Sequence, residues 1–318
     1  MGCTTEKLRL VYGDATLGVA GRAFHVIFNY MHGGIESLRT GGREWVYRAP
    51  KPTFWRATTD NDRGCRFPYR SGVWMSADMF LPCTAARVSV DGRAIALPVA
   101  PENNRYSRDE FADTVSVTFS FETLTTPSAG VDVTYTVTGD RIAVSADYHG
   151  RRGLPELPVF GMRWIMPTPA AGFTYEGLSG ETYPDRKRGA VHGVFEVQGL
   201  PVTPYIVPQE CGMHMDTDWV EIVRDTSLDN SARDGTPARL RFIRSGRPFA
   251  FSCLPYTAEE LENATHHEEL PPVRRTVLCI CGAVRGVGGI DSWHTDVEEP
   301  YHIDAQGELN TSFAIEFN

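Results

Sequence analysis

The chain has 318 residues, 40 of them acidic and 31 basic, and its formal net charge at pH 7 is −9. This length allows one large β domain or two ordinary ones, and a hydrophobic content of 42% is enough to fill a core. The acidic balance and the lack of a basic run argue against a nucleic-acid partner, since binding a phosphate backbone needs clustered Lys and Arg.

The N-terminus begins Met1-Gly2-Cys3 and continues into polar residues up to Lys7. It has neither the apolar core of a secretion signal nor a membrane span. Glu6 also departs from the myristoylation pattern, which has Ser or Thr at that position. We therefore expect a cytoplasmic protein with no membrane partner and with a flexible stretch over residues 1–7.

Short runs that alternate apolar and polar residues, or that are rich in β-branched side chains, predict strands along the whole chain. In chain order these runs are 8–11, 24–28, 86–90, 115–121, 131–137, 142–148, 159–165, 219–223, 240–243, 249–253, 276–281 and 311–317. Turn signals such as Asp91-Gly92 and Ser245-Gly246 separate them at the spacing of antiparallel hairpins. The predicted class is all-β, a large antiparallel sandwich.

One short helix is predicted near residues 257–266. Thr257 and Glu260 form a capping box, in which each side chain accepts a hydrogen bond from the backbone of the other, and Leu261 would anchor the next turn. No other stretch has a sustained helical period. Because no low-complexity linker interrupts the strands, we expect residues 8–318 to form one domain.

Seven cysteines are scattered between Cys3 and Cys281, and the odd number and wide spacing differ from the paired framework of a secreted disulfide protein. We expect reduced thiols. Cys279 and Cys281 would share one strand face, which is poor geometry for tetrahedral zinc, and the nine histidines are spread out. We therefore predict no metal site in this chain.

Segment 54–64 is dense in hydrogen-bonding groups and ends at a glycine; its notable residues are Arg56, Asp60, Asn61, Asp62 and Gly64. Two interpretations are open. The segment either presents polar groups to a ligand or partner, or forms a buried Asp/Asn network in which Arg56 pairs with a carboxylate. A buried network is the more common role of such residues.

Segment 177–186 is also unusually polar, and it contains Glu181, Tyr183, Asp185 and Arg186. Glu181 and Asp185 could serve as an acid/base pair. The alternative is an Arg–carboxylate bracket that fixes a loop, which is the more frequent arrangement.

Three glycines in segment 286–289 precede Asp291-Ser292-Trp293. The dinucleotide fingerprint needs a third glycine at fixed spacing and a following helix, and neither is present. A loop with this composition can approach a ligand closely while Trp293 presents a flat apolar face, such as the one that stacks on a sugar ring. Packing of Trp293 in the core is the alternative.

The segments 55–64, 177–186, 203–212 and 286–293 together resemble, in order and spacing, the C-terminal domain of family 2 β-galactosidases. The similarity extends over residues 8–317, and the start and length are similar to the small subunit of heteromeric, two-gene β-galactosidases. The resemblance implies a supersandwich like that of galactose mutarotases. Two departures from the family pattern are Thr182 and Cys211.

The resemblance also implies a division of labour between two chains. The two catalytic Glu residues of the retaining mechanism lie on a TIM barrel, which would belong to a large partner subunit. This chain is then expected to carry no catalytic residue and no cofactor, while Mg²⁺ and Na⁺ or K⁺ are expected on the large subunit. The isolated chain would be inactive, and the complex would hydrolyse terminal β-D-galactosides such as lactose.

By the match of the motifs, Trp293 with Asp291 and Ser292 would reach the pocket of the partner and contact the sugar. Gly64 would act as the hinge of a loop that continues through Cys65 and Arg66 at the rim of that pocket. Eight further residues are expected to structure loops or the subunit interface: Arg56, Asp60, Asn61, Asp62, Glu181, Tyr183, Asp185 and Arg186.

Two other functions remain open. The first is a stand-alone aldose epimerase or carbohydrate-binding module of the same fold, for which His214 and Glu210 are candidate acid/base groups. The second is a pure assembly subunit, in which the Trp293 loop fills a subunit interface without contacting sugar.

Overall fold

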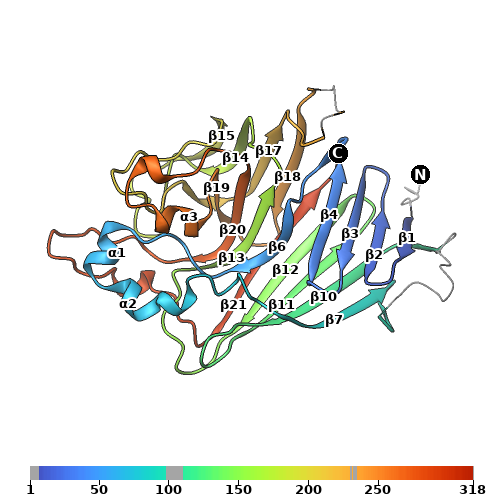
Figure 1. Cartoon of the computed structure of the whole chain (residues 1–318), viewed down its shortest axis with the longest axis horizontal. Coiled ribbons are helices and arrows are strands. Elements are labelled where there is room, and N and C mark those ends of the chain that lie inside the picture. The colour runs from blue at the N-terminus through green and yellow to red at the C-terminus, as the bar shows by residue number, and fades with distance from the viewer. Residues whose placement is uncertain (1–6, 98–109, 230, 232–234, 318) are drawn as a thin grey trace.

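The computed structural model describes residues 7–97, 110–229, 231 and 235–317 (Figure 1). The stretch 1–7 predicted to be flexible lies, apart from Lys7, outside the described residues, and so does Cys3. The six described cysteines are free thiols.

Three antiparallel sheets make up the described fold. The six-stranded sheet has the order β5 (Arg43–Glu44), β4 (Gly34–Thr40), β3 (Phe24–Asn29), β2 (Thr16–Ala20), β1 (Leu8–Tyr12) and β9 (Glu110–Ala112). The five-stranded sheet has the order β16 (Met213–Thr217), β19 (Phe249–Leu254), β20 (Thr276–Val284), β13 (Val159–Met166) and β6 (Arg48–Thr53).

The ten-stranded sheet runs through the whole molecule. Its order is β15 (His192–Gln198), β14 (Gly172–Leu178), β17 (Trp219–Arg224), β18 (Ala238–Arg244), β21 (Glu308–Glu316), β12 (Arg141–His149), β11 (Gly130–Val137), β10 (Val115–Glu122), β7 (Cys83–Val90) and β8 (Arg93–Ile95). The last strand, β21, pairs with both β12 and β18 and so joins the two halves of the sheet. The predicted all-β antiparallel class is confirmed.

Alternation of side chains explains why the central strands form. In β10, Val117 and Phe119 point into the core, while Ser116 and Thr118 face the other way. The outward hydroxyl of Thr118 bonds to Thr134 of β11 at 2.9 Å. One face of each strand is therefore buried and the other is bridged by cross-strand hydrogen bonds, which stabilises this register.

Aromatic rings fill the space between the sheets. The ring centre of Phe28, in the six-stranded sheet, lies 5.6 Å from the ring centre of Tyr135 in the ten-stranded sheet. Phe160 of the five-stranded sheet lies 5.4 Å from Tyr148 in β12. The two smaller sheets therefore pack against different parts of the large one, and a single core cluster contains residues from Leu8 to Phe317.

The predicted helix is confirmed as α3 (Ala258–Asn263). Both halves of its capping box are present, since Thr257 Oγ1 accepts from the Glu260 amide at 3.3 Å and Glu260 accepts from the Thr257 amide at 2.8 Å. The helix ends three residues before the predicted end because Ala264 takes an extended conformation.

Two short helices were not predicted, α1 (Asp60–Gly64) and α2 (Phe67–Ser71). A second capping box, between Thr59 and Asp62, begins α1, and Pro68 lies in the first turn of α2. Five residues are too few for a helical period to appear in the sequence. Three 3₁₀ segments complete the described helices: Gly72–Trp74, His267–Glu269 and Glu299–Tyr301.

Helices α1 and α2 lie at one end of the molecule beside the loop that follows β20, away from the two chain ends (Figure 1). None of the helices in the described part of the chain combines the length and apolar character that crossing a bilayer requires.

Candidate functional site

Three of the segments singled out in the sequence meet at the end of the molecule that carries α1. Asn61 in α1 donates a hydrogen bond to the carbonyl of Val287 at 3.0 Å. The Asp185 carboxylate accepts from the amides of Val287, at 3.0 Å, and Gly288, at 2.8 Å. Segments 54–64 and 177–186 therefore both hold the glycine-rich loop that follows β20 (Figure 1).

Asp62 is the centre of this contact region. It is buried between two guanidinium groups, 2.6 Å from Arg56 Nη1 and 2.9 Å from Arg285 Nη1. The amide and hydroxyl of Thr59 each donate to the same carboxylate at 2.9 Å. Burial alone would raise the pKa of Asp62, but Arg56 and these hydrogen bonds hold it below its usual value. The geometry is that of the buried-network interpretation.

Arg285 and Asp296 belong to this network, and the sequence did not indicate either one. Arg285 is fully buried and also pairs with Glu156 at 2.5 Å and with Asp296, while its guanidinium lies 4.2 Å from the centre of the Phe67 ring. Asp296 in turn pairs with Arg70 of α2. The one available signal was a charged residue placed directly between an apolar strand and a glycine.

The glycines of the loop allow close approach to these partners. A Cβ at Gly286 would lie 2.9 Å from Asp185 Cγ, and one at Gly289 would lie 2.7 Å from Asn61 Nδ2. Gly288 and Gly289 also have positive φ, +68° and +76°. A side chain at these positions would displace the loop from the residues that support it. Close packing therefore explains the glycines, and a nucleotide-binding role is not needed to explain them.

For a similar reason, namely close packing, a side chain cannot be accommodated at Gly64 unless a neighbour moves, and the φ angle of Gly64 is not positive. It is the last residue of α1, and the residue with left-handed geometry is Arg66, with φ +61°. A Cβ at Gly64 would lie 2.0 Å from His294 Nδ1. Gly64 therefore lets α1 pack against the residue next to Trp293.

Trp293 is not in the core, because 85% of its surface is exposed. Its loop is shaped by Asp291, which accepts from the Trp293 amide at 2.9 Å and from the Thr295 hydroxyl at 2.5 Å. The bond from Thr295 holds the pKa of Asp291 below its usual value. Ser292 is exposed beside them. The loop thus presents an indole that the described residues leave uncovered.

An apolar segment near this loop was not predicted. Exposed apolar side chains follow one another between residues 69 and 80: Tyr69, Val73, Met75, Met79 and Phe80. Phe80 alone is 70% exposed. Such a concentration of large apolar side chains in one segment is typical of a protein-binding surface.

An open pocket beside the loop is lined by Asn61 and by four further predicted residues, Asp60, Glu181, Tyr183 and Arg186. Glu181 is exposed and accepts from Thr203 at 2.8 Å. Both oxygens of Asp185 are occupied by loop amides, and Arg186 donates to the carbonyl of Gly288. The bracket arrangement therefore accounts for Asp185 and Arg186, whereas Glu181 remains open to the pocket.

The pair proposed for an epimerase, His214 and Glu210, is not brought together in one cavity. The His214 ring stacks on Phe251 at 4.8 Å and lies 4.5 Å from the Tyr175 ring. Burial lowers the pKa of His214 to about 4. Glu210 lines two cavities, and His214 belongs to the wall of neither.

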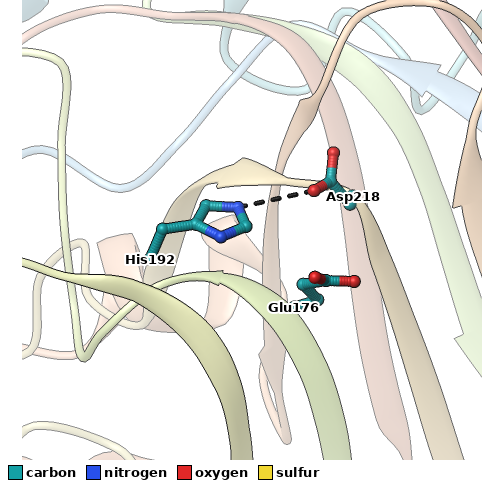
Figure 2. Close-up of side chains that lie close together, drawn as sticks. All are labelled: Glu176, His192 and Asp218. Carbon is teal, nitrogen blue, oxygen red and sulfur yellow. Dashed lines mark ion pairs between the residues drawn. The ribbon is translucent and has the colours of Figure 1, made fainter.

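Figure 2 shows a separate cluster of possible metal ligands, Glu176, His192 and Asp218, on the strand ends around β14, β15 and β17. Their ligand atoms lie within 4.8 Å of one another. Glu176 already accepts from the Trp219 indole at 2.7 Å, and Asp218 pairs with Arg244 at 2.9 Å. Each of the two carboxylates thus already has a donor from the protein, which accounts for its position. The expectation that this chain binds no metal stays a prediction.

Two solved structures are similar to this chain at low sequence identity and low TM-score. One is a galactose mutarotase-like protein from Lactobacillus casei, with a TM-score of 0.41, 10% identity and coverage of 95% of this chain and 100% of that one. The other is a galactose mutarotase related enzyme from Lactobacillus acidophilus, with a TM-score of 0.43, 9% identity and coverage of 95% and 97%.

Sequence relatives are of two lengths. The "Beta-galactosidase small subunit" of Latilactobacillus sakei is 58% identical over 318 residues, which is 100% of both chains. A "Beta-galactosidase" of Halalkalibacterium halodurans is 32% identical over 97% of this chain but only 28% of its own length. "Beta-galactosidase BgaC" of Bifidobacterium adolescentis is 30% identical over 95% of this chain and 27% of its own length.

The family model described as "Beta galactosidase small chain" matches residues 20–315, which is nearly the whole chain. Together with the full-length relative, this match shows that the chain belongs to the β-galactosidase small chain family.

Proposed function

We propose that this chain is the small subunit of a two-chain β-galactosidase and that it completes the galactoside-binding site of a large TIM-barrel subunit. Its full-length relative carries the name of a small subunit, and the longer relatives match it over only 27 to 28% of their own length. The remaining part would be supplied by a separate chain. The partner would carry both catalytic Glu residues and the expected Mg²⁺ and Na⁺ or K⁺.

The observation that carries this proposal is the exposed Trp293 on a loop held rigidly from behind. A pyranose has an apolar face of C–H groups, and an indole stacks on such a face. An aromatic group contributes more to binding when its position is fixed before the ligand arrives, because ordering a mobile loop costs free energy. Asn61, Asp185 and Arg186 provide that support through the loop backbone.

The exposed apolar segment 69–80 is the surface we assign to the large subunit. It is connected to the Trp293 loop through the ion pair between Arg70 and Asp296. Docking of this segment would therefore place the Trp293 loop relative to the partner. The chain itself would position the sugar, while proton transfer and covalent chemistry take place on the partner. We expect terminal β-D-galactosides such as lactose as substrates, and a cytoplasmic location.

The first test compares hydrolysis by the purified chain, by the purified large subunit and by the two mixed. We expect no release of galactose from lactose by the isolated chain and a large gain when the partner is added. Lactose hydrolysis by the isolated chain would refute the proposal.

The second test is Trp293→Ala in the assembled enzyme. We expect kcat/KM for lactose to fall about tenfold or more, since loss of the stacking face removes at least about 1.4 kcal/mol of binding. Size-exclusion chromatography should show unchanged assembly. Ile290→Ala is the matched control, because Ile290 is an exposed apolar residue of the same loop and should leave kcat/KM unchanged. Unaltered kinetics for Trp293→Ala would rule out sugar contact.

A further inference from the structure

An open pocket of about 490 Å³ lies between α1, the turn at residues 181–186, the segment 205–210 and the backbone of Gly288 and Gly289. This volume is within the range of about 300 to 1,000 Å³ that is typical of small-molecule sites. Trp293 does not line the pocket. Any ligand held here would thus be bound by a different set of groups from the one assigned to the galactoside.

Four polar residues of this pocket are deeply buried, and two of them are Tyr183 and Glu210, with exposures of 5% and 7%. The Tyr183 hydroxyl has no hydrogen-bond partner among the described residues. Burial raises the pKa of Glu210 to about 8, despite the nearby charge of Arg56, so the carboxyl is mostly protonated at neutral pH. Buried polar groups are rarely left without a partner, because the loss costs about 1 to 3 kcal/mol.

A second cavity behind Glu210 explains some of the unpaired groups nearby but not Tyr183. It has a volume of about 30 Å³, enough for about one water molecule, and it is lined by Trp55, Arg56 and Glu210. The Trp55 indole nitrogen and Arg56 Nε, which lack partners, can be satisfied there. Of these two cavities Tyr183 lines only the open pocket, and we assign the missing partner of its buried hydroxyl to that side.

The walls of the pocket indicate the class of ligand. Asp60 and Glu181 offer acceptors, Arg186 offers donors, and the ring of Tyr205 offers a flat apolar surface. The carboxylates of Asp60 and Glu181 disfavour phosphate or another anion, and the guanidinium of Arg186 offsets part of their attraction for a cation. Hydroxyl groups, which both donate and accept, fit this mixture and also the protonated Glu210.

We propose that this pocket binds a neutral saccharide, with the Tyr183 hydroxyl and the Glu210 carboxyl hydrogen-bonded to sugar hydroxyls. The proposal does not depend on the assigned galactosidase function, since it concerns groups of this chain alone. Because Gly288 and Gly289 form one wall, a bound sugar would also contact the backbone of the Trp293 loop.

The test is titration of the full chain with D-galactose, D-glucose and lactose, followed by saturation-transfer NMR and calorimetry. We expect saturable binding of at least one of these sugars. Tyr183→Phe, which removes only the hydroxyl, should weaken the binding about five- to tenfold. Ile290→Ala, at an exposed residue of the Trp293 loop that does not line the pocket, should leave it unchanged. Spermidine and inorganic phosphate are the charged probes, and neither should bind.

Three results would overturn the proposal: no saturable binding of any of the three sugars, binding of a charged probe in place of sugar, or sugar binding that Trp293→Ala abolishes and Tyr183→Phe preserves. If Tyr183→Phe does not fold, Glu181→Gln serves instead, because Glu181 is exposed and its substitution does not disturb the core. This variant should weaken sugar binding about two- to fivefold. Activation of the large subunit is measured separately, so failure of this proposal and failure of the subunit assignment can be distinguished.

Discussion

Asp62 and Glu210 are both buried acids, yet their surroundings move their pKa values in opposite directions. Burial acts to raise both values. Asp62 pairs directly with Arg56 and Arg285 and also accepts hydrogen bonds from Thr59, so its charged form is stabilised. Glu210 is influenced by Arg56 without such contacts, and burial prevails there.

The raised pKa of Glu210 predicts that Glu210→Gln gains stability relative to the wild type as the pH rises. Between about pH 4.5, the ordinary value, and about pH 8, the folded chain keeps a proton that the unfolded chain has lost. The free energy of unfolding of the wild type therefore decreases as pH rises through this window, and the glutamine has no proton to lose. We expect the melting temperature of the variant relative to wild type to be higher at pH 8 than at pH 5. An equal difference at both pH values would contradict the assigned pKa.

Gly64→Ala tests the contact between α1 and the Trp293 loop. The added methyl would collide with the His294 ring, which is exposed and can move, so we expect a small loss of stability but a displaced loop. In the assembled enzyme kcat/KM should fall severalfold. The double variant Gly64→Ala/His294→Ala is the control and should recover most of the loss. If the double variant is as impaired as the single one, Gly64 acts by another route, such as the hinge expected from the sequence.

At the scale of elements, the loop from 286 to 295 depends on side chains of other segments for its position. It forms no strand, and its hydrogen bonds to other segments include those with Asn61, Asp185 and Arg186. Substitution of one supporting side chain removes only the hydrogen bonds of that side chain, since no sheet has to unfold. The loop can therefore be perturbed selectively.

Asp185→Ala should loosen the loop without disturbing the subunit interface. Two backbone amides lose a charged acceptor, worth about 1.5 to 3 kcal/mol, and we expect kcat/KM to fall about tenfold or more. Hydrogen exchange at Val287 and Gly288 should become faster. Asp216→Ala is the control, because Asp216 pairs with Lys187 in a half-exposed salt bridge away from the loop amides. Unchanged exchange rates in Asp185→Ala would argue against this support.

Strand prediction found strands with a buried face, but it also missed some of them, such as β2, β4 and β14. All twelve predicted runs lie within strands apart from one terminal residue, Phe317. The strand β6 was missed because it contains two prolines and lies at a sheet edge, where the missing donors are tolerated. The strand β15 was missed because it is an edge strand with no buried face.

At the scale of the whole molecule, one end carries α1, α2 and the Trp293 loop, and this end also carries the apolar segment 69–80 (Figure 1). Large apolar side chains in contact with water cost free energy that a partner recovers on binding. The position of this segment beside the loop is what a subunit would need to complete a site on another chain.

Phe80→Asp should weaken assembly with the large subunit. A charge in the centre of an apolar contact loses the burial of the ring and is itself costly to desolvate, so we expect the dissociation constant to rise at least tenfold. Leu228→Asp is the matched control, since Leu228 is 61% exposed and follows β17 far from α2. Analytical ultracentrifugation of the mixed subunits measures the effect. Equal affinity for the two variants would place the interface elsewhere.

The sequence by itself determined the all-β class, most strands, helix α3 and the family. These properties follow from local patterns, because alternation of apolar residues and a capping box each act over a few neighbouring residues. The motifs also identified Asp185, Asn61 and Trp293 as residues of interest, but without their contacts.

Only the tertiary structure decided which of these residues meet. Arg56, Asp62, Glu156, Arg285 and Asp296 come from four parts of the chain and form one ionic network, in which Arg56, Asp62 and Arg285 are buried. Their attraction depends on distance in space and on exclusion of water, and neither is encoded in sequence spacing. For the same reason the exposure of Trp293, the His294 contact at Gly64 and the unpaired Tyr183 hydroxyl emerged only from the folded chain.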